Sequence, residues 1–172
     1  MDLPEFELIY KQWNASLQKY AHYFVRDEES SRSIVNDLFL HLWFSKKQPE
    51  NLQGYLYKAV KNASLNHIRK NGNVPLLYLE DEQLTTLSDA LPKAETRLID
   101  SEKSRFLNKI ISLLPERRQM VFRLHRLEGF SYAEIAELMQ ISVRTVEDHL
   151  AKSMQFIHSH AKQLVDQSLT EA

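Results

Sequence analysis

The chain contains no cysteine and only three glycines among its 172 residues. Without cysteine there can be no disulfide, thiolate metal site or cysteine nucleophile. The few glycines form no phosphate-binding loop, and no serine is flanked by glycines as in a nucleophile elbow. No apolar run is long enough to span a membrane, and the acidic N-terminus, MDLPE, does not have the pattern of a signal peptide. We therefore expect a cytoplasmic protein that does not insert into membranes.

The chain also has little net charge, and its charges are unevenly distributed. The formal net charge is −1. Lys and Arg outnumber Asp and Glu by ten to eight in residues 1–75 and by nine to eight in residues 105–172, whereas residues 76–104 carry three against seven. Only local patches could attract phosphates, so the chain by itself is predicted to bind nucleic acid weakly.

Seven histidines are the remaining candidates for metal ligands. His158 and His160 are two residues apart, so on a helix they point to different faces. The other five are His22, His41, His67, His125 and His149. None of these forms the paired spacing with a carboxylate that is typical of a zinc protease helix. We expect no metal site, no cofactor and no enzymatic activity.

Helical periodicity dominates the sequence and predicts an all-α protein. Apolar residues recur at steps of three and four from Phe6 to Phe24, and similar runs follow. The NGNVP segment at 71–75 is typical of a turn and opens an acidic stretch with weak periodicity. We predict two small helical domains, residues 1–70 and 95–172, joined by an acidic linker at 71–94.

The segment GFSYAEIAELMQISVRTV at 129–146 has the pattern of a helix-turn-helix. Ser131 and Glu134 have the spacing of a capping box at the start of the first helix, and Ser142 is placed to cap the second. Gln140 falls at the turn position that needs a positive φ, where a residue with a Cβ costs about 1 kcal/mol. The predicted buried stripe of the second helix is Val143, Val146, Leu150, Met154 and Ile157.

In a helix-turn-helix the second helix enters the major groove of DNA. Arginine can bind guanine through two hydrogen bonds, and acidic side chains can accept from the cytosine amino group. The predicted DNA-binding residues are Arg117, Arg118, Ser142, Arg144, Thr145, Asp148, His149 and Lys152. Arg117 and Arg118 start the preceding helix and would contact phosphates. A helical hairpin whose charges only face water would share the pattern.

A second polar face is predicted in the N-terminal half. Tyr55, Lys58, Asn62, Asn66 and Arg69 lie at steps of three and four and share one helix face. Cations for phosphates, amides for base edges and an aromatic ring for stacking suit an unpaired strand. A solvated helix face would carry similar residues.

Four segments together resemble the sigma factor family. IVNDLFLHLW at 34–43 resembles the helix that docks on the β′ clamp of core RNA polymerase, and GYLYKAVKNA at 54–63 resembles the segment that melts and reads the −10 element. LPERR at 114–118 and the helix-turn-helix resemble region 4, which reads the −35 element. Their order around a short acidic linker resembles the extracytoplasmic-function (ECF) group of the sigma-70 family. VEDHL at 146–150 also resembles the iron-citrate-type branch found in Bacteroidetes.

The resemblance implies a sigma factor that directs core RNA polymerase to promoters and initiates transcription. Residues 1–70 would be region 2 and residues 95–172 region 4. The implied partners are the β′ clamp and β flap of the polymerase, promoter DNA and a membrane-anchored anti-sigma factor. The residues implied in −10 binding are Tyr55, Lys58, Lys61, Asn62, Asn66 and Arg69; those implied in polymerase binding are Asn36, Asp37 and His41. We expect Trp13 and Trp43 in the core.

Two other classes of protein share parts of this pattern. A one-component transcription regulator would use residues 1–70 for sensing or dimerisation and bind duplex DNA as a dimer. The aromatic and cationic face from Tyr55 to Arg69 is unfavourable for a dimer interface. A helical adaptor that binds only protein leaves Arg144 and Lys152 of the second helix unexplained.

Overall fold

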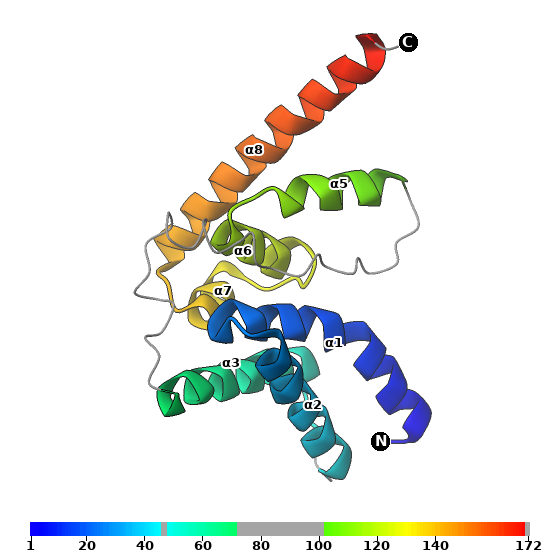
Figure 1. The fold of residues 1–172 in the computed structure, drawn as a ribbon, viewed down its shortest axis with the longest axis vertical. Helices are drawn as coiled ribbons and strands as arrows, with labels where there is room; N and C mark the ends of the chain where they lie inside the picture. The colour runs from blue at the N-terminus through cyan, green and yellow to red at the C-terminus, as the bar shows by residue number, and fades with distance from the viewer. Residues whose placement is uncertain (46–47, 72–101, 171–172) are drawn as a thin grey trace. The chain divides into compact units, whose positions relative to one another are not determined.

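The computed structural model describes residues 1–45, 48–71 and 102–170, and these residues form helices and short connections without a strand. The predicted all-α class is therefore confirmed for the described residues. The helices are α1 (Leu3–Val25), α2 (Glu28–Phe44), α3 (Leu52–Lys70), α5 (Glu102–Ser112), α6 (Glu116–Arg126), α7 (Tyr132–Met139) and α8 (Val143–Thr170) (Figure 1). The chain divides into two compact units, unit 1 at residues 1–79 and unit 2 at residues 80–172. The predicted linker at 71–94 lies outside the described residues except for Asn71, which caps the end of α3.

Each helix of unit 1 begins at a side-chain cap. Asp2 Oδ1 accepts the Glu5 amide at 2.9 Å, and Asp27 Oδ2 accepts the Ser30 amide at 2.9 Å. Asn51 caps α3 in the same way. These bonds satisfy amides that have no partner within the helix, which fixes where each helix starts.

The core of unit 1 is formed where α1 packs against both α2 and α3. Tyr20 of α1 and Tyr57 of α3 are fully buried, with ring centroids 5.2 Å apart. The other large buried apolar side chains are Leu17, Tyr23, Phe24, Val35, Phe39, Leu42, Leu56, Val60 and Ile68. Burying each of these stabilises the unit by about 1.5–3 kcal/mol and holds the outer faces of α2 and α3 in fixed positions.

The two tryptophans lie nearer the surface than predicted. Trp43 is 37% exposed, so its placement in the core is wrong; Trp13 is half-buried. The Trp43 ring packs edge-on against Phe6, with centroids 4.9 Å apart, at the end of α2. An apolar pattern does not show how completely the partner helix covers each apolar side chain.

His22 makes the stability of unit 1 depend on pH. Burial lowers the pKa of His22, and the positive charge of Arg26 lowers it further, against opposing effects of Glu28 and Asp27. The unfolded chain takes up this proton near pH 6.5 and the folded chain only at lower pH, so the unfolding free energy falls as the pH drops below about 6.5. We expect His22→Gln to flatten this part of the profile in thermal unfolding between neutral pH and about pH 5.5. His41→Gln, at an exposed histidine, is the control; parallel profiles for His22→Gln and wild type would contradict the prediction.

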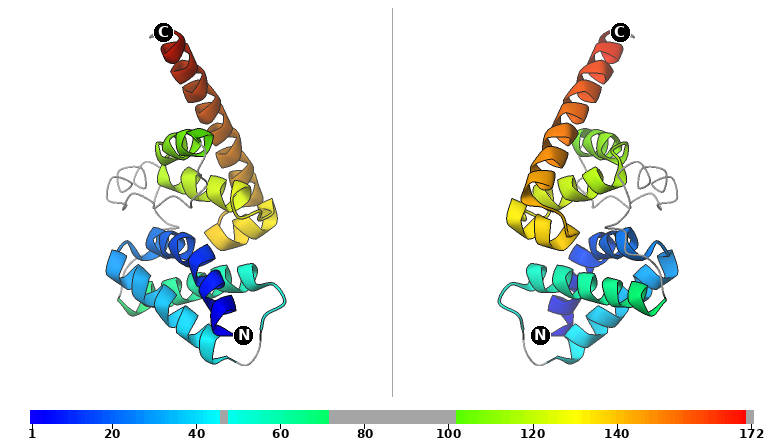
Figure 2. Two further views of the ribbon diagram at one scale, coloured as in Figure 1. Left: turned by 90° about the vertical axis from the view of Figure 1, so that its right-hand side faces the viewer. Right: turned by 90° about the vertical axis from the view of Figure 1, so that its left-hand side faces the viewer.

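Unit 2 is built around α8, which contacts α5, α6 and α7. Figure 2 shows α7 beside the first turns of α8, while the last turns of α8 extend beyond α5, α6 and α7. Ile135 and Met139 of α7 are buried together with Val121 of α6 and Val146 of α8. These contacts fix the angle between α7 and α8, which decides what α8 presents to solvent.

Candidate nucleic-acid interface

The two helices of the predicted helix-turn-helix, α7 and α8, both begin at serine caps. Ser131 Oγ accepts the Glu134 amide at 3.2 Å, and Glu134 Oε1 accepts the Ser131 amide at 3.1 Å, which confirms the capping box. Ser142 Oγ accepts the Thr145 amide at 3.0 Å and lies 2.8 Å from Thr145 Oγ1. The first turn of α8 is therefore held in place by its own side chains.

The turn between α7 and α8 passes through Gln140 in the left-handed region. Its φ is 55° and its ψ is 48°, as the sequence predicts. The Ile141 amide donates to the Ala136 carbonyl at 3.0 Å and the Gln140 amide to the Glu137 carbonyl at 3.3 Å. This pair of bonds is a Schellman motif, in which glycine is the usual residue at the Gln140 position. Gln140 therefore has a strained backbone conformation, and this conformation sets the angle at which α7 and α8 cross.

Relieving this strain should stabilise unit 2. We expect Gln140→Gly to raise its unfolding free energy by about 1 kcal/mol, because glycine has no Cβ to oppose a positive φ. Gly129, at φ 76°, offers the reverse test, since a Cβ added there meets nothing within 4 Å and only the backbone is strained. Gly129→Ala should lower the unfolding free energy by about the same amount. Chemical denaturation measures both, and changes of equal sign would contradict this account.

α8 presents one face to the core and one to solvent. Val146, His149, Leu150 and Ser153 are buried, and the Ser153 hydroxyl donates to the His149 carbonyl at 2.6 Å. The predicted exposure of His149 is wrong: the side chain is 2% exposed, because it lies three residues after Val146 and four before Ser153 on the inner face. It is not available to a DNA groove in this structure. The predicted apolar stripe is also shifted, since Val143 is exposed.

The outer face of α8 carries most of the other predicted contacts. Arg144, Asp148 and Lys152 are exposed, and Thr145 is half-buried against its cap. Ala151 and Gln155 lie on the same face at steps of three and four and are exposed. Sequence reasoning missed both, although their spacing from Arg144 and Asp148 could have indicated them. A small side chain at Ala151 would allow close approach to a thymine methyl group.

Asp148 lies among cations. Its Oδ2 is 3.0 Å from Lys152 Nζ, one helical turn away. The hydrogen bond from Lys152 lowers the pKa of Asp148, helped by the positive charges of Lys152, His149 and Arg118. Arg118 and Arg117 belong to α6 and are half-buried. The positive charge of Arg118 therefore acts on Asp148 at the outer face of α8.

The polar face predicted on the N-terminal half lies along α3. Tyr55 is half-buried, and Lys58, Asn62, Asn66 and Arg69 are exposed. They lie opposite the buried side chains of Leu56, Tyr57, Val60, Ser64 and Ile68. The predicted Lys61 is half-buried and lies to one side of this face. α3 can therefore present an aromatic ring, two amides and two cations in one line.

An exposed face of α2 combines polar and apolar side chains. The predicted contacts Asn36, Asp37 and His41 are all exposed. Leu40 is 55% exposed and Phe44 is 77% exposed on the same face, opposite the core side chains of α2. Sequence reasoning missed these two residues because it selected only the polar side chains of this face. Exposed apolar side chains rimmed by polar ones are typical of a protein-binding surface.

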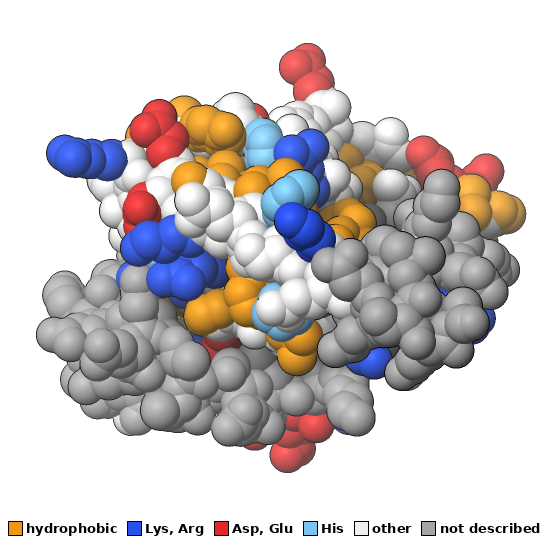
Figure 3. Space-filling model, turned by 90° about the horizontal axis from the view of Figure 1, so that it is seen from above, with side chains coloured by type: hydrophobic (Ala, Val, Ile, Leu, Met, Phe, Trp, Pro, Cys, Tyr) orange, Lys and Arg blue, Asp and Glu red, His pale blue; other side chains and the backbone are white. Residues whose placement is uncertain are grey.

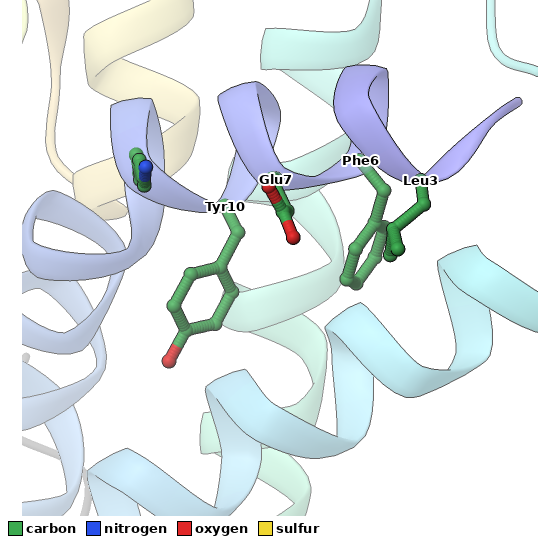
Figure 4. Close-up of a pocket in the computed structure, with 5 residues that line it drawn as sticks. Leu3, Phe6, Glu7 and Tyr10 are labelled. Atoms are coloured by element: carbon green, nitrogen blue, oxygen red, sulfur yellow. The ribbon is translucent and has the colours of Figure 1, made fainter.

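Unit 1 also has an open groove of about 460 Å³ along the first turns of α1. Phe6 and Tyr10 point from α1 toward α2, with Leu3 and Glu7 beside them (Figure 4). Lys11 completes the lining. Glu7 is the single acid among these lining residues, and Lys11 is the single cation.

Several further features of the described residues bear on function. None of their His, Asp and Glu side chains forms a group of three that could hold a metal ion. No helix in the described part of the chain is both long and apolar enough to cross a membrane. In Figure 3, basic and acidic side chains both lie among hydrophobic ones on the face shown, which agrees with the small net charge.

Comparison with known proteins shows what the chain is similar to. Residues 107–157 match the family described as Sigma-70, region 4, a span that runs from α5 into α8 and includes the helix-turn-helix. The ECF RNA polymerase sigma-E factor of Haemophilus influenzae is 27% identical over 117 residues. Residues 107–157 therefore match sigma-70 region 4, and the relatives to which the chain is similar include sigma factors of the ECF group. The sigma-70 family is not a family of classical enzymes.

Other relatives extend the likeness to the N-terminal half of the chain. The ECF sigma factor SigE of Mycolicibacterium smegmatis is 21% identical over 92% of the chain, and the sigma-H factor of Pseudomonas aeruginosa is 23% identical over 91%. The matches span 62% of the sigma-E and SigE relatives and 86% of sigma-H. The sigma factor RpoE of Bartonella quintana, crystallised with the anti-sigma factor NepR, shares the fold with a TM-score of 0.50 at 16% identity, over 93% of this chain and 98% of that one.

Proposed function

We propose that the chain is a sigma factor that directs core RNA polymerase to specific promoters and initiates transcription. The observation that carries the proposal is the capped α7–α8 pair, which lies within the region 4 match and exposes Arg144 on the first turn of α8. N-terminal residues of such a helix contact base edges when it lies in the major groove. The small net charge supports a protein that binds DNA as part of a larger, more basic complex.

We propose the following division of the chain. Residues 1–70 form region 2 and bind the unpaired −10 strand along α3. Residues 71–94 form the linker, and residues 95–172 form region 4, which binds the −35 duplex and the β flap. The proposed −35 contacts are Arg117, Arg118, Ser142, Arg144, Thr145, Asp148 and Lys152, without His149. The proposed −10 contacts are Tyr55, Lys58, Asn62, Asn66 and Arg69, with Lys61 at the margin.

The exposed face of α2 is the proposed surface for the β′ clamp. Asn36, Asp37 and His41 supply polar contacts. Leu40 and Phe44 supply apolar area that costs free energy when it stays in water. A surface of this mixed kind suits a partner that binds and is later released.

The proposal includes an anti-sigma partner and a cytoplasmic location, where the polymerase acts. A membrane-anchored anti-sigma factor would block the polymerase or DNA faces until a signal arrives; the Bartonella relative, crystallised with NepR, supports this kind of regulation. The chain itself would carry out no chemistry. Its binding energy for the unpaired strand stabilises the melted promoter, and the polymerase forms the bonds.

The test is co-purification with core RNA polymerase by size exclusion, followed by run-off transcription from a library of upstream fragments. We expect stoichiometric binding and new start sites that share a −35 and a −10 motif. A chain that does not bind core, but binds duplex DNA by itself as a dimer, would be a one-component transcription regulator. Binding to core without new start sites would also contradict the proposal.

A further inference from the structure

The outer face of α8 carries as many acidic as basic side chains near the proposed base contacts. Arg144 and Lys152 are its cations, and Glu147 and Asp148 are its exposed acids. Duplex DNA has a dense row of phosphates, and proteins that bind it with little regard to sequence do so through unpaired cations. The outer face of α8 has no excess of positive charge, so it is poorly suited to bind DNA of arbitrary sequence. Its acidic side chains are therefore candidates for a role in selectivity.

Lys152 does not present its charge freely. Its Nζ is 3.0 Å from Asp148 Oδ2, and the two side chains are 50% and 53% exposed. The Asp148 carboxylate also interacts electrostatically with Arg118 of α6. One carboxylate thus faces cations from two helices of unit 2.

We propose that Asp148 is a selectivity residue: in the free chain it pairs with Lys152 and lowers the attraction of α8 for DNA of arbitrary sequence. The inference rests on the proposed function, since selectivity matters only if α8 reads a promoter. On random DNA, the Asp148 carboxylate repels phosphates. It also keeps Lys152 from neutralising a phosphate, so no counterion is released from the DNA at that point. On the right site, the same carboxylate accepts a hydrogen bond from a cytosine amino group, which offsets this cost. Selectivity is the difference between these two affinities.

The experiment uses the full chain and a short fluorescent duplex of random sequence, with binding followed by anisotropy between about 50 and 200 mM KCl. Asp148→Asn removes the charge and releases Lys152. We expect it to bind more tightly than wild type and to steepen the slope of log K against log salt by about 0.9, the value for one additional phosphate contact. Its advantage over wild type should then shrink about three-fold across this salt range.

Two matched variants separate release of Lys152 from a simple change in net charge. Glu147→Gln removes one negative charge from the neighbouring exposed residue and should leave the salt slope unchanged. Asp148→Asn combined with Lys152→Ala should return the slope to the wild-type value. Thermal unfolding checks that each variant is folded.

Three results would overturn the proposal: Asp148→Asn binding no tighter than wild type, Glu147→Gln giving the same steeper slope, or Lys152→Ala failing to reverse the effect of Asp148→Asn. No polymerase is present in this assay. A chain that fails to bind core RNA polymerase therefore contradicts the proposed function but leaves the measurement on Asp148 intact, and the reverse also holds.

Discussion

Replacing Arg144 by alanine is expected to lower promoter-specific transcription by about 5- to 150-fold, while binding to core RNA polymerase stays unchanged. A guanidinium that binds guanine through two hydrogen bonds contributes about 1–3 kcal/mol of discrimination, which corresponds to this range. Arg144 is exposed on the first turn of α8, where the Ser142 cap fixes the backbone. Run-off transcription and size exclusion with core measure the two quantities separately.

Two further variants make the Arg144 result specific. Arg144→Lys keeps the charge but cannot form the paired hydrogen bonds, so it should lose most of the promoter preference and keep the attraction for phosphate. Arg105→Ala, at an exposed arginine of α5, removes the same charge from unit 2 and should leave transcription unchanged. Equal losses for Arg105→Ala and Arg144→Ala would show that only net charge matters.

The second large effect is expected on α2. Replacing Leu40 and Phe44 together by serine should weaken binding to core RNA polymerase at least about 30-fold, because even one central contact of an interface contributes about 2 kcal/mol or more. Both side chains are more than half exposed in the free chain, so the double variant should unfold at the same temperature as wild type. Competition with a labelled wild-type chain for core measures the affinity.

Leu8→Ser is the matched control for the α2 variant. Leu8 is a 68% exposed leucine of α1 in the same unit, outside the proposed surface. Its replacement removes exposed apolar area without touching α2, and core binding should not change. If Leu8→Ser weakens core binding as much as the double variant does, α2 is not the polymerase surface.

Features that depend on neighbours in sequence could be predicted from the sequence. The capping box at Ser131 and the positive φ of Gln140 follow from rules that act within one or two helical turns, and both are present. The buried and exposed faces of α3 also follow from the period of a helix. Val60 is buried and Asn62 is exposed, and residues two apart in the sequence lie on nearly opposite sides of a helix. These features required no knowledge of the partner helix.

Features that depend on packing between helices could not be predicted in the same way. His149 is polar, so the pattern placed it outside, whereas α8 turns it toward the core beside Val146. Leu40 and Phe44 are apolar, so their residue type favours burial, whereas they lie on the face of α2 opposite its core side chains and are exposed. In each case residue type and helix orientation disagree, and only the tertiary contacts decide between them.

The length of α8 makes it a lever. The buried residues from Val146 to Ser153 form the pivot, and the helix continues unbroken to Thr170. At 1.5 Å per residue, Leu150 lies about 10 Å from the N-terminal end of α8 and about 30 Å from its C-terminal end. A tilt about the pivot therefore moves the C-terminal end about three times as far as the N-terminal end. Since the chain has no cysteine, a single cysteine introduced at exposed Lys162 could carry a spectroscopic probe on the C-terminal part of α8. A small movement of the first turn of α8 would then appear as a larger movement of the probe.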